Sequence, residues 1–127
     1  MAEDYVEAIL EIMNAKGRCR AIDLARRFSV SQVTVNRTAG RLVRDGLIET
    51  QPYGPLELTP AGKRLAEAAQ RRHTIVFNLL LAIGVDSETA EIDSEGMEHH
   101  ASPTTLAAIQ RFLKQVDVGL PSTSRKP

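Results

Sequence analysis

Apolar side chains recur every three or four residues along most of the chain, which is the spacing of amphipathic helices. The first segment with this spacing covers residues 4–13, and Gly17 offers a stop signal after it. The second such segment covers residues 21–28 and ends at Ser29-Val30-Ser31. The third begins at Ser31, a favourable N-cap, and runs to Asp45. The pattern therefore predicts three helices before residue 46. We expect the second helix to bury four side chains: Ile22, Leu24, Ala25 and Phe28.

The period then changes from that of a helix to that of a strand. Residues 47–49 and 56–58 are short apolar runs on either side of Pro52-Tyr53-Gly54-Pro55, which predicts a β-hairpin. Three helices followed by a hairpin, all before residue 60, is the order of a winged helix-turn-helix. The short turn at Ser29-Val30-Ser31 then joins the two helices of the DNA-reading motif.

Three further helices are predicted after the hairpin. Thr59 is a capping residue before a proline at the first helical position, so a long helix begins there and runs past His73 towards Gly84. Shorter helices are predicted at residues 87–100 and 103–116. The segment 119–127 is rich in Pro, Ser and Thr and has no periodicity, which predicts flexibility.

These elements predict a mainly α protein with two parts. Residues 1–62 form a winged helix-turn-helix DNA-binding domain with a small β-hairpin wing. Residues 63–117 form an all-α domain, and residues 118–127 form a flexible tail.

Composition is that of an ordinary globular protein, with 127 residues of which 43% are hydrophobic and 25% charged. The single cysteine, Cys19, cannot form an internal disulfide, so we expect a reducing compartment and a small, partly buried side chain. No apolar run approaches the roughly 20 residues of a transmembrane helix. The acidic start at Glu3-Asp4 is unlike a signal peptide. We therefore expect a cytoplasmic protein without membrane contact.

The formal net charge is zero, but the charges are unevenly distributed. Residues 17–64 hold nine Lys or Arg and four Asp or Glu, whereas residues 65–127 hold six basic and eight acidic side chains. Residues 86–98 alone contain six acids and no base. A basic segment favours a nucleic-acid partner and an acidic one favours cations, so the two parts predict different ligands.

The third predicted helix carries groups suited to DNA on its outward positions, namely Gln32, Thr34, Asn36, Arg37, Thr38, Arg41 and Arg44. Amides, hydroxyls and guanidinium groups bind base edges and phosphates. The residues near the helix start are placed to read bases, whereas Arg37 and Arg41 are placed to reach the backbone. We predict DNA contacts from Ser31, Gln32, Thr34, Asn36, Arg37 and Arg41. The alternative is a solvated amphipathic helix, against which its position between a short turn and a hairpin counts.

A second candidate site lies in the acidic segment. Glu95, Glu98 and His99 stand at i, i+3 and i+4, so a helix places them on one face. Like charges at this spacing repel by a few tenths of a kcal/mol per pair, and a bound cation relieves the repulsion. His73, midway along the long helix, could add an imidazole nitrogen. A solvated acidic face is the alternative that spacing alone leaves open.

Asp4 and Glu7 show the same three-residue spacing on the first predicted helix. If all these groups converge, the ligand set contains four carboxylates and two imidazoles, with no thiolate or thioether. Such oxygen-rich sets suit Mn²⁺, with Fe²⁺ or Zn²⁺ as alternatives. Four carboxylates can also neutralise and bridge two adjacent ions.

Taken together, these residues resemble the manganese-transport regulator branch of the diphtheria-toxin-repressor family. The resemblance extends from Glu3 to Gln115, and its most specific stretches are residues 3–7, 21–46, 72–73 and 95–100. It implies metal ligands at Asp4, Glu7, His73, Glu95, Glu98 and His99. Iron-sensing relatives carry Met in place of Glu7 and Cys in place of Glu95. One departure is the wing, which usually carries an Arg-Gly turn and here has Tyr53-Gly54-Pro55.

Our hypothesis is a homodimeric transcriptional repressor, activated by Mn²⁺ with one or two ions per subunit, that binds palindromic double-stranded operators. The resemblance implies metal-uptake genes as its targets. We expect the two-fold interface to use the apolar side of residues 75–85 together with Leu106, Ile109 and Leu113. One alternative is a metal-independent winged-helix regulator with a small-molecule effector. A di-metal carboxylate enzyme is disfavoured, because the Glu-x-x-His motif of helical di-iron sites does not occur here. We therefore expect no enzymatic activity.

Overall fold

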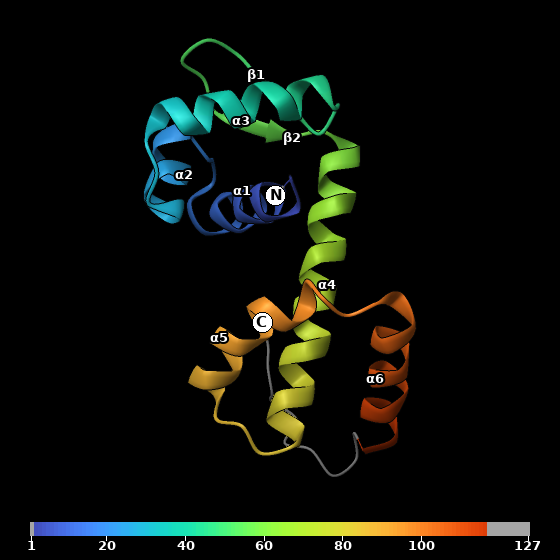
Figure 1. The fold of residues 1–127 in the computed structure, drawn as a ribbon. Helices are drawn as coiled ribbons and strands as arrows, with labels where there is room; N and C mark the ends of the chain where they lie inside the picture. Colours follow the sequence, from blue (N-terminus) through green and yellow to red (C-terminus); the bar gives the residue numbers. More distant parts are fainter. Residues whose placement is uncertain (1, 117–127) are drawn as a thin grey trace. The chain divides into compact units, whose positions relative to one another are not determined.

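The structure is a computed structural model and describes residues 2–116 of the chain (Figure 1). Over this range, helices and a two-stranded antiparallel hairpin follow one another in the predicted order. The elements are α1 Ala2–Lys16, α2 Ala21–Phe28, α3 Gln32–Arg44, β1 Ile48–Thr50, β2 Leu56–Leu58, α4 Pro60–Ala82, α5 Ser87–Glu98 and α6 Pro103–Val116. The fold class is confirmed, and the tail predicted at residues 118–127 lies outside the described residues.

The start of the hairpin differs from the prediction by one residue, since β1 begins at Ile48 and not at Leu47. Leu47 N–H donates to the carbonyl of Leu42 at 2.9 Å, and Gly46 adopts φ +76°. Both features belong to the end of α3, where a left-handed glycine satisfies the last carbonyls. The helix cap therefore uses the residue that the apolar pattern assigned to the strand.

The chain divides into two compact units, one extending to Ala69 and the other starting at Gln70. α4 contributes its first part to one unit and its remainder to the other. No helix in residues 2–116 combines the length and apolar character that a membrane span requires.

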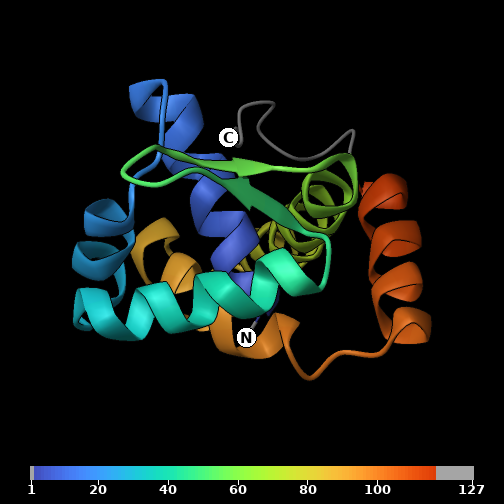
Figure 2. The same cartoon turned by 90° about the horizontal axis from the view of Figure 1, so that it is seen from above.

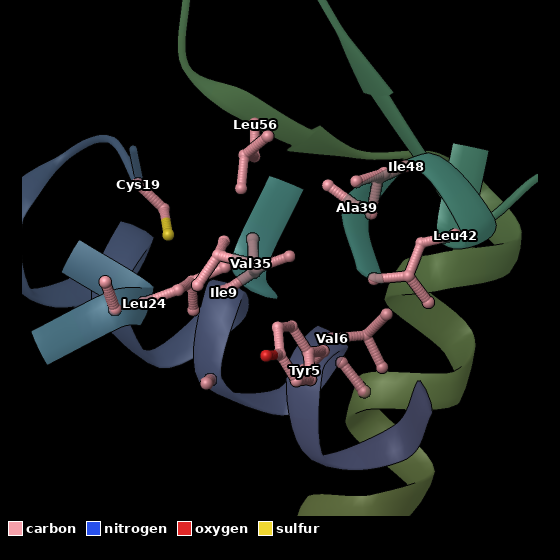
Figure 3. Packing of buried hydrophobic residues seen from close by; sticks show 13 residues of the cluster. Tyr5, Val6, Ile9, Cys19, Leu24, Val35, Ala39, Leu42, Ile48 and Leu56 are labelled. Carbon is pink, nitrogen blue, oxygen red and sulfur yellow. The ribbon is translucent and has the colours of Figure 1, made fainter. Parts of the chain in front are cut away.

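The first unit has its core between the three N-terminal helices and the hairpin (Figure 3). Val6 and Ile9 of α1, Leu24 of α2 and Val35 of α3 are almost fully buried there. The rings of Tyr5 and Phe28 stack with centroids 4.7 Å apart. The larger buried set consists of Tyr5, Val6, Ala8, Ile9, Cys19, Leu24, Ala25, Val35, Ala39, Leu42, Ile48, Leu56 and Ala66.

Two burial predictions for this unit are corrected. Ile22 is exposed, because it stands two residues, or 200° of helix, from the buried Leu24. Cys19 is completely buried and not partly so. Its carbonyl accepts a hydrogen bond from Leu56 N–H at 2.8 Å, which forms an additional bridge beside β2 and holds residue 19 in the core.

The hairpin and α4 are joined through Thr59 and Gly62. Thr59 N–H donates to the carbonyl of Leu47 at 3.0 Å, and its hydroxyl donates to the carbonyl of Gly46 at 2.6 Å. The same hydroxyl caps α4 by accepting from Gly62 N–H at 3.1 Å. A side chain at Gly62 would overlap the carbonyl of Leu47, so glycine is required there for the close approach of two backbones.

The second unit packs the end of α4 against α5 and α6. Its core contains Val76, Leu80, Ala90 and Leu106. The prediction that Leu106 belongs to a subunit interface is therefore corrected. Leu106 is 8% exposed and packs within its own unit, because α6 turns this side chain towards α4.

Candidate DNA-reading surface and metal centre

α3 presents a polar face to solvent beside the hairpin. Seen from above, α3 and the hairpin lie together in front of α1, and α3 contacts β1 (Figure 2). Ser31 caps the helix, accepting from Thr34 N–H at 3.1 Å. All predicted DNA-contacting side chains are exposed: Ser31, Gln32, Thr34, Asn36, Arg37 and Arg41. Their placement at the start and along one helix leaves amide, hydroxyl and guanidinium groups accessible to a duplex.

Thr38 corrects the predicted outward set, because its side chain is 6% exposed. It stands three residues after Val35 and four before Leu42, and both of these are buried. Its hydroxyl accepts from Arg41 Nη2 at 3.4 Å. Thr38 therefore lies on the buried face of α3, and its hydroxyl orients Arg41, which is predicted to bind phosphate.

Val33 is a surface residue that the apolar pattern did not single out. Its side chain is 65% exposed, although it lies between Gln32 and Thr34 at the start of α3. It stands two residues before the buried Val35, so helix geometry turns it 200° away from the core. An exposed apolar residue in a polar stretch, out of phase with the buried positions, was the signal in the sequence.

The second unit brings three of the predicted metal ligands together. His73 of α4 and Glu95 and Glu98 of α5 each offer a ligand atom, and these atoms all lie within 4.8 Å of one another. His73 Nδ1 is 3.7 Å from Glu98 Oε2. α5 packs through Ala90, Ser94 and Glu98, which recur every four residues, so Glu98 enters the space beside α4.

Glu98 is the most constrained member of the cluster. Its side chain is 2% exposed, yet its Oε1 has no hydrogen-bond partner among the described residues. A buried carboxylate oxygen without a partner is costly, because it has lost its hydration without compensation. A bound cation would supply that compensation, and the donor set of one imidazole and two carboxylates fits a divalent transition metal.

His73 is held by groups from the same unit. Its Nε2 is 3.1 Å from Glu91 Oε2, and its Nδ1 is 3.4 Å from Ser94 Oγ. The hydrogen bond with Glu98 raises the pKa of His73 to about 9, against the opposing effect of burial and with help from the charges of Glu91, Glu98 and Glu95. Without a metal ion, the imidazole is therefore protonated at neutral pH.

Sequence reasoning assigned no role to Glu91 or Ser94. Ser94 is fully buried, and its hydroxyl also donates to the Glu91 carbonyl at 3.2 Å. Residues 91, 94, 95 and 98 follow the i, i+3, i+4, i+7 spacing of one helix face. That spacing was the available signal, and extending the face one turn towards the helix start would have included both residues.

The remaining predicted ligands lie outside this cluster. His99 is the exposed C-cap of α5, directly after Glu98. Asp4 and Glu7 lie half-buried on α1, in the first unit. The second unit by itself thus assembles His73, Glu95 and Glu98, and the other three residues stay predictions.

Comparisons with known proteins match both halves of the chain. Residues 1–56 match the family model described as the N-terminal DNA-binding domain of iron-dependent repressors, and residues 59–124 match the metal-binding and dimerisation domain of the same family. The transcriptional regulator MntR of Escherichia coli O157:H7 is 44% identical over 115 residues, covering 91% of this chain and 74% of the relative. MntR of Lysinibacillus sphaericus is 37% identical over 115 residues, covering 91% and 83%.

Solved structures show the same fold. A manganese-dependent transcriptional repressor in complex with manganese aligns with a TM-score of 0.81 and 28% identity, covering 90% of this chain and 53% of that chain. IdeR of T. acidophilum aligns with a TM-score of 0.76 and 28% identity, covering 93% and 54%. The chain thus spans about half the length of these two structures.

Proposed function

Since this chain belongs to the iron-dependent repressor family of metal-dependent, DNA-binding transcriptional regulators, we propose that it is a cytoplasmic repressor of metal-uptake genes, activated by Mn²⁺. The observation that carries the proposal is the cluster of His73, Glu95 and Glu98, in which a buried carboxylate oxygen has no partner among residues 2–116. The likeness to MntR proteins and to a manganese-dependent repressor supports Mn²⁺ as the ion.

We assign the metal site to His73, Glu95 and Glu98, completed by Asp4, Glu7 and His99. When bound, a divalent ion would supply the positive charge that neutralises the carboxylates of this set. Glu98 offers its unpartnered Oε1, and His73 gives up its proton to offer a ring nitrogen. In the metal-free protein, Glu91 and Ser94 hold the imidazole from its two nitrogens. A bound ion would replace one of these contacts, and the other would keep the ring in place. Four carboxylates suffice for two ions.

Because the proposed ligands belong to both units, a bound ion would link the DNA-binding unit to the second unit and would limit their relative motion. If the restricted state matches the operator better, the ion raises DNA affinity, and by linkage DNA raises ion affinity by the same factor. Gln32, Thr34 and Asn36 then read bases, Arg37 and Arg41 bind phosphates, and Ser31 contacts the DNA beside them.

We further propose a homodimer formed through the outward face of α5. Ile92 is 72% exposed, although it is a large apolar residue. Ile92 stands two residues from each of the buried Ala90 and Ser94, so it points away from the unit's own core. The match to a dimerisation domain supports a second copy as the partner. Two-fold symmetry would present two α3 helices to a palindromic operator.

The experiment is a DNA titration with and without Mn²⁺. The full chain with Mn²⁺ enriches a duplex from a random pool, and fluorescence anisotropy at a stated salt concentration then measures affinity. We expect Mn²⁺ to raise the affinity and Glu98→Gln to abolish that increase. Glu88→Gln, on the first turn of the same helix, is the matched control and keeps the increase. An affinity that Mn²⁺ does not change would overturn the mechanism and favour a metal-independent regulator.

Glu7→Ala tests the proposed ligands of α1. We expect it to weaken Mn²⁺ binding, whereas Glu3→Ala, one turn earlier on the same helix, leaves it unchanged. Isothermal titration with Mn²⁺ alone measures both variants, and equal Mn²⁺ affinities would remove Glu7 from the ligand set.

A further inference from the structure

The tip of the hairpin contains a residue in an unfavourable backbone conformation. Gly54 N–H donates to the Gln51 carbonyl at 2.9 Å, which closes a four-residue turn with Pro52 at its second position. Tyr53 occupies the third position with φ +61°. Turns of this kind favour glycine at that position, because a Cβ is strained in the left-handed region. Here the glycine follows one residue later, and a tyrosine takes the strained place.

The side chain of Tyr53 makes no packing contact that would offset the strain of its backbone. It is 100% exposed, so its ring buries no surface against the protein. Ser29 is the other non-glycine residue with positive φ in residues 2–116, and there the strain ends α2 and starts the turn to α3. The backbone of Tyr53 closes the hairpin turn, but the fold makes no use of its side chain, and a bulky residue in the left-handed region is typical of functional positions.

The strained turn is fastened to the DNA-reading motif. Arg20 Nη1 donates to the Tyr53 carbonyl at 3.1 Å. Arg20 caps α2, and its N–H donates to Asp23 Oδ2 at 2.9 Å. Asp23 in turn pairs with Lys16 at 2.7 Å. The position of the wing tip is therefore set from the start of α2, the first helix of the helix-turn-helix.

The charges of the hairpin restrict which part of it can approach DNA. Glu49 and Glu57 stand directly opposite each other in the two strands, and both are exposed. Phosphates are repelled along this stretch, whereas the tip from Gln51 to Gly54 carries no charged side chain. The hairpin and α3 lie on the same side of the first unit (Figure 2). A duplex bound by α3 can thus meet the wing at its neutral tip.

We propose that Tyr53 is a DNA-contacting residue at the wing tip, whose hydroxyl donates to a phosphate oxygen while its ring packs against the adjacent sugar. Tyrosine is one of the side chains that bind the DNA backbone. The contact is independent of sequence and lies beside the bases that α3 reads. Being neutral, it displaces no counterions, so it adds affinity without adding salt dependence. This inference rests on the proposed function.

The test measures DNA affinity and folding stability in the same variants. The probes are the duplex enriched by the full chain with Mn²⁺ and a scrambled duplex of equal length. Tyr53→Phe removes the hydroxyl and is expected to weaken binding about threefold. Tyr53→Gly removes the whole side chain and is expected to weaken binding about tenfold on both duplexes, at an unchanged salt slope. Because Tyr53→Gly relieves the strained φ, its melting temperature should rise.

Ser29→Gly is the matched control, since it relieves the other strained residue. It should raise the melting temperature and leave DNA affinity unchanged. Wild-type affinity in Tyr53→Gly would overturn the inference, as expected if the tyrosine served a protein partner. A lower melting temperature together with weaker binding would also overturn it, by showing a structural role. Failure of the proposed function looks different, because wild-type affinity would then not respond to Mn²⁺, whereas the Tyr53 contact is measured on any bound duplex.

Discussion

At the scale of single residues, the buried ionisable groups determine the chemistry of the second unit. Glu98 and His73 form a close pair that is sheltered from solvent, and the imidazole carries a proton at neutral pH. If His73 is a metal ligand, as we propose, a bound ion competes with that proton for a ring nitrogen. The proposed site therefore predicts that metal binding depends on pH through this one imidazole.

We expect Mn²⁺ affinity to rise with pH until the pKa of His73, about 9, is passed. About one proton should be released per site at pH 7.5, because the imidazole is protonated before binding and neutral afterwards. Calorimetric titrations in buffers of different ionisation enthalpy measure this number. His100→Gln is the control, because it replaces an exposed histidine outside the proposed ligand set and should leave the number of released protons unchanged. Release of no proton would contradict the assignment of His73 as a ligand.

The raised pKa of His73 also predicts how the folding stability of the metal-free protein depends on pH. The folded-state pKa of His73 lies above its ordinary value of 6.5, so its contribution to stability is complete below pH 6.5. That contribution is lost as pH rises through about 9. We expect the melting temperature of metal-free wild type to fall over this interval more than that of His73→Gln.

Cys19 is expected to be chemically inert in the folded state. Burial, followed by the charge of Asp23, raises the pKa of its thiol to about 11. Alkylating reagents need both the thiolate and access to it. Iodoacetamide at pH 8 should therefore label the denatured protein readily and the folded protein very slowly. Rapid labelling of folded protein would show that the bridge between residue 19 and Leu56 opens readily.

At the scale of elements, periodicity and capping predicted most of the fold. Ser31 and Thr59 are caps whose hydrogen bonds form as their positions in the sequence suggested. Side-chain burial was harder to predict, because it depends on which neighbour covers a helix. Leu106 illustrates this, since α6 has an apolar stripe suited equally to its own core or to a second copy. Thr38 illustrates the reverse, as a polar residue on the buried face.

The candidate metal site shows the same limit. Spacing on one helix was sufficient to group Glu95 with Glu98, whereas bringing His73 to them requires the packing of α4 against α5. Glu91 and Ser94 were not predicted, because a serine and one more acid are not distinctive in an acidic segment. Their role follows only from the position of the His73 ring, which contacts both of them.

Gly62 should be far less replaceable than a glycine within a helix. Gly62→Ala places a methyl group against the Leu47 carbonyl, and we expect it to destabilise the protein by about 3 kcal/mol. Gly40→Ala is the comparison, because the added methyl meets only Arg44 Nη1 at 3.8 Å. This variant should gain about 1 kcal/mol from helix propensity. Urea denaturation measures both changes, and an equal effect would contradict the close approach at Gly62.

At the scale of the whole molecule, the proposed homodimer predicts that DNA recognition depends on association of two copies. We expect Ile92→Glu to shift the chain from dimer to monomer in sedimentation experiments, because it places a charge in the proposed apolar interface. Binding to a palindromic duplex should weaken strongly, since a monomer engages one half-site only. Glu88→Gln again serves as the control on α5. A dimer that persists in Ile92→Glu would relocate the interface to another face.

The acidic pair of the hairpin, Glu49 and Glu57, also disfavours pairing between the hairpins of two molecules. A sheet of two strands leaves two open edges, and unpaired edges invite strands of other molecules to add to them. The outer edge of β2 is partly closed by the hydrogen bond from Leu56 to Cys19. The remaining edge belongs to β1, whose central residue Glu49 is exposed and pairs across the ladder with the exposed Glu57 of β2. Stacking the wings of two molecules edge to edge would gather four such carboxylates. The hairpin is thereby kept available for a duplex and protected from aggregation through its own strands.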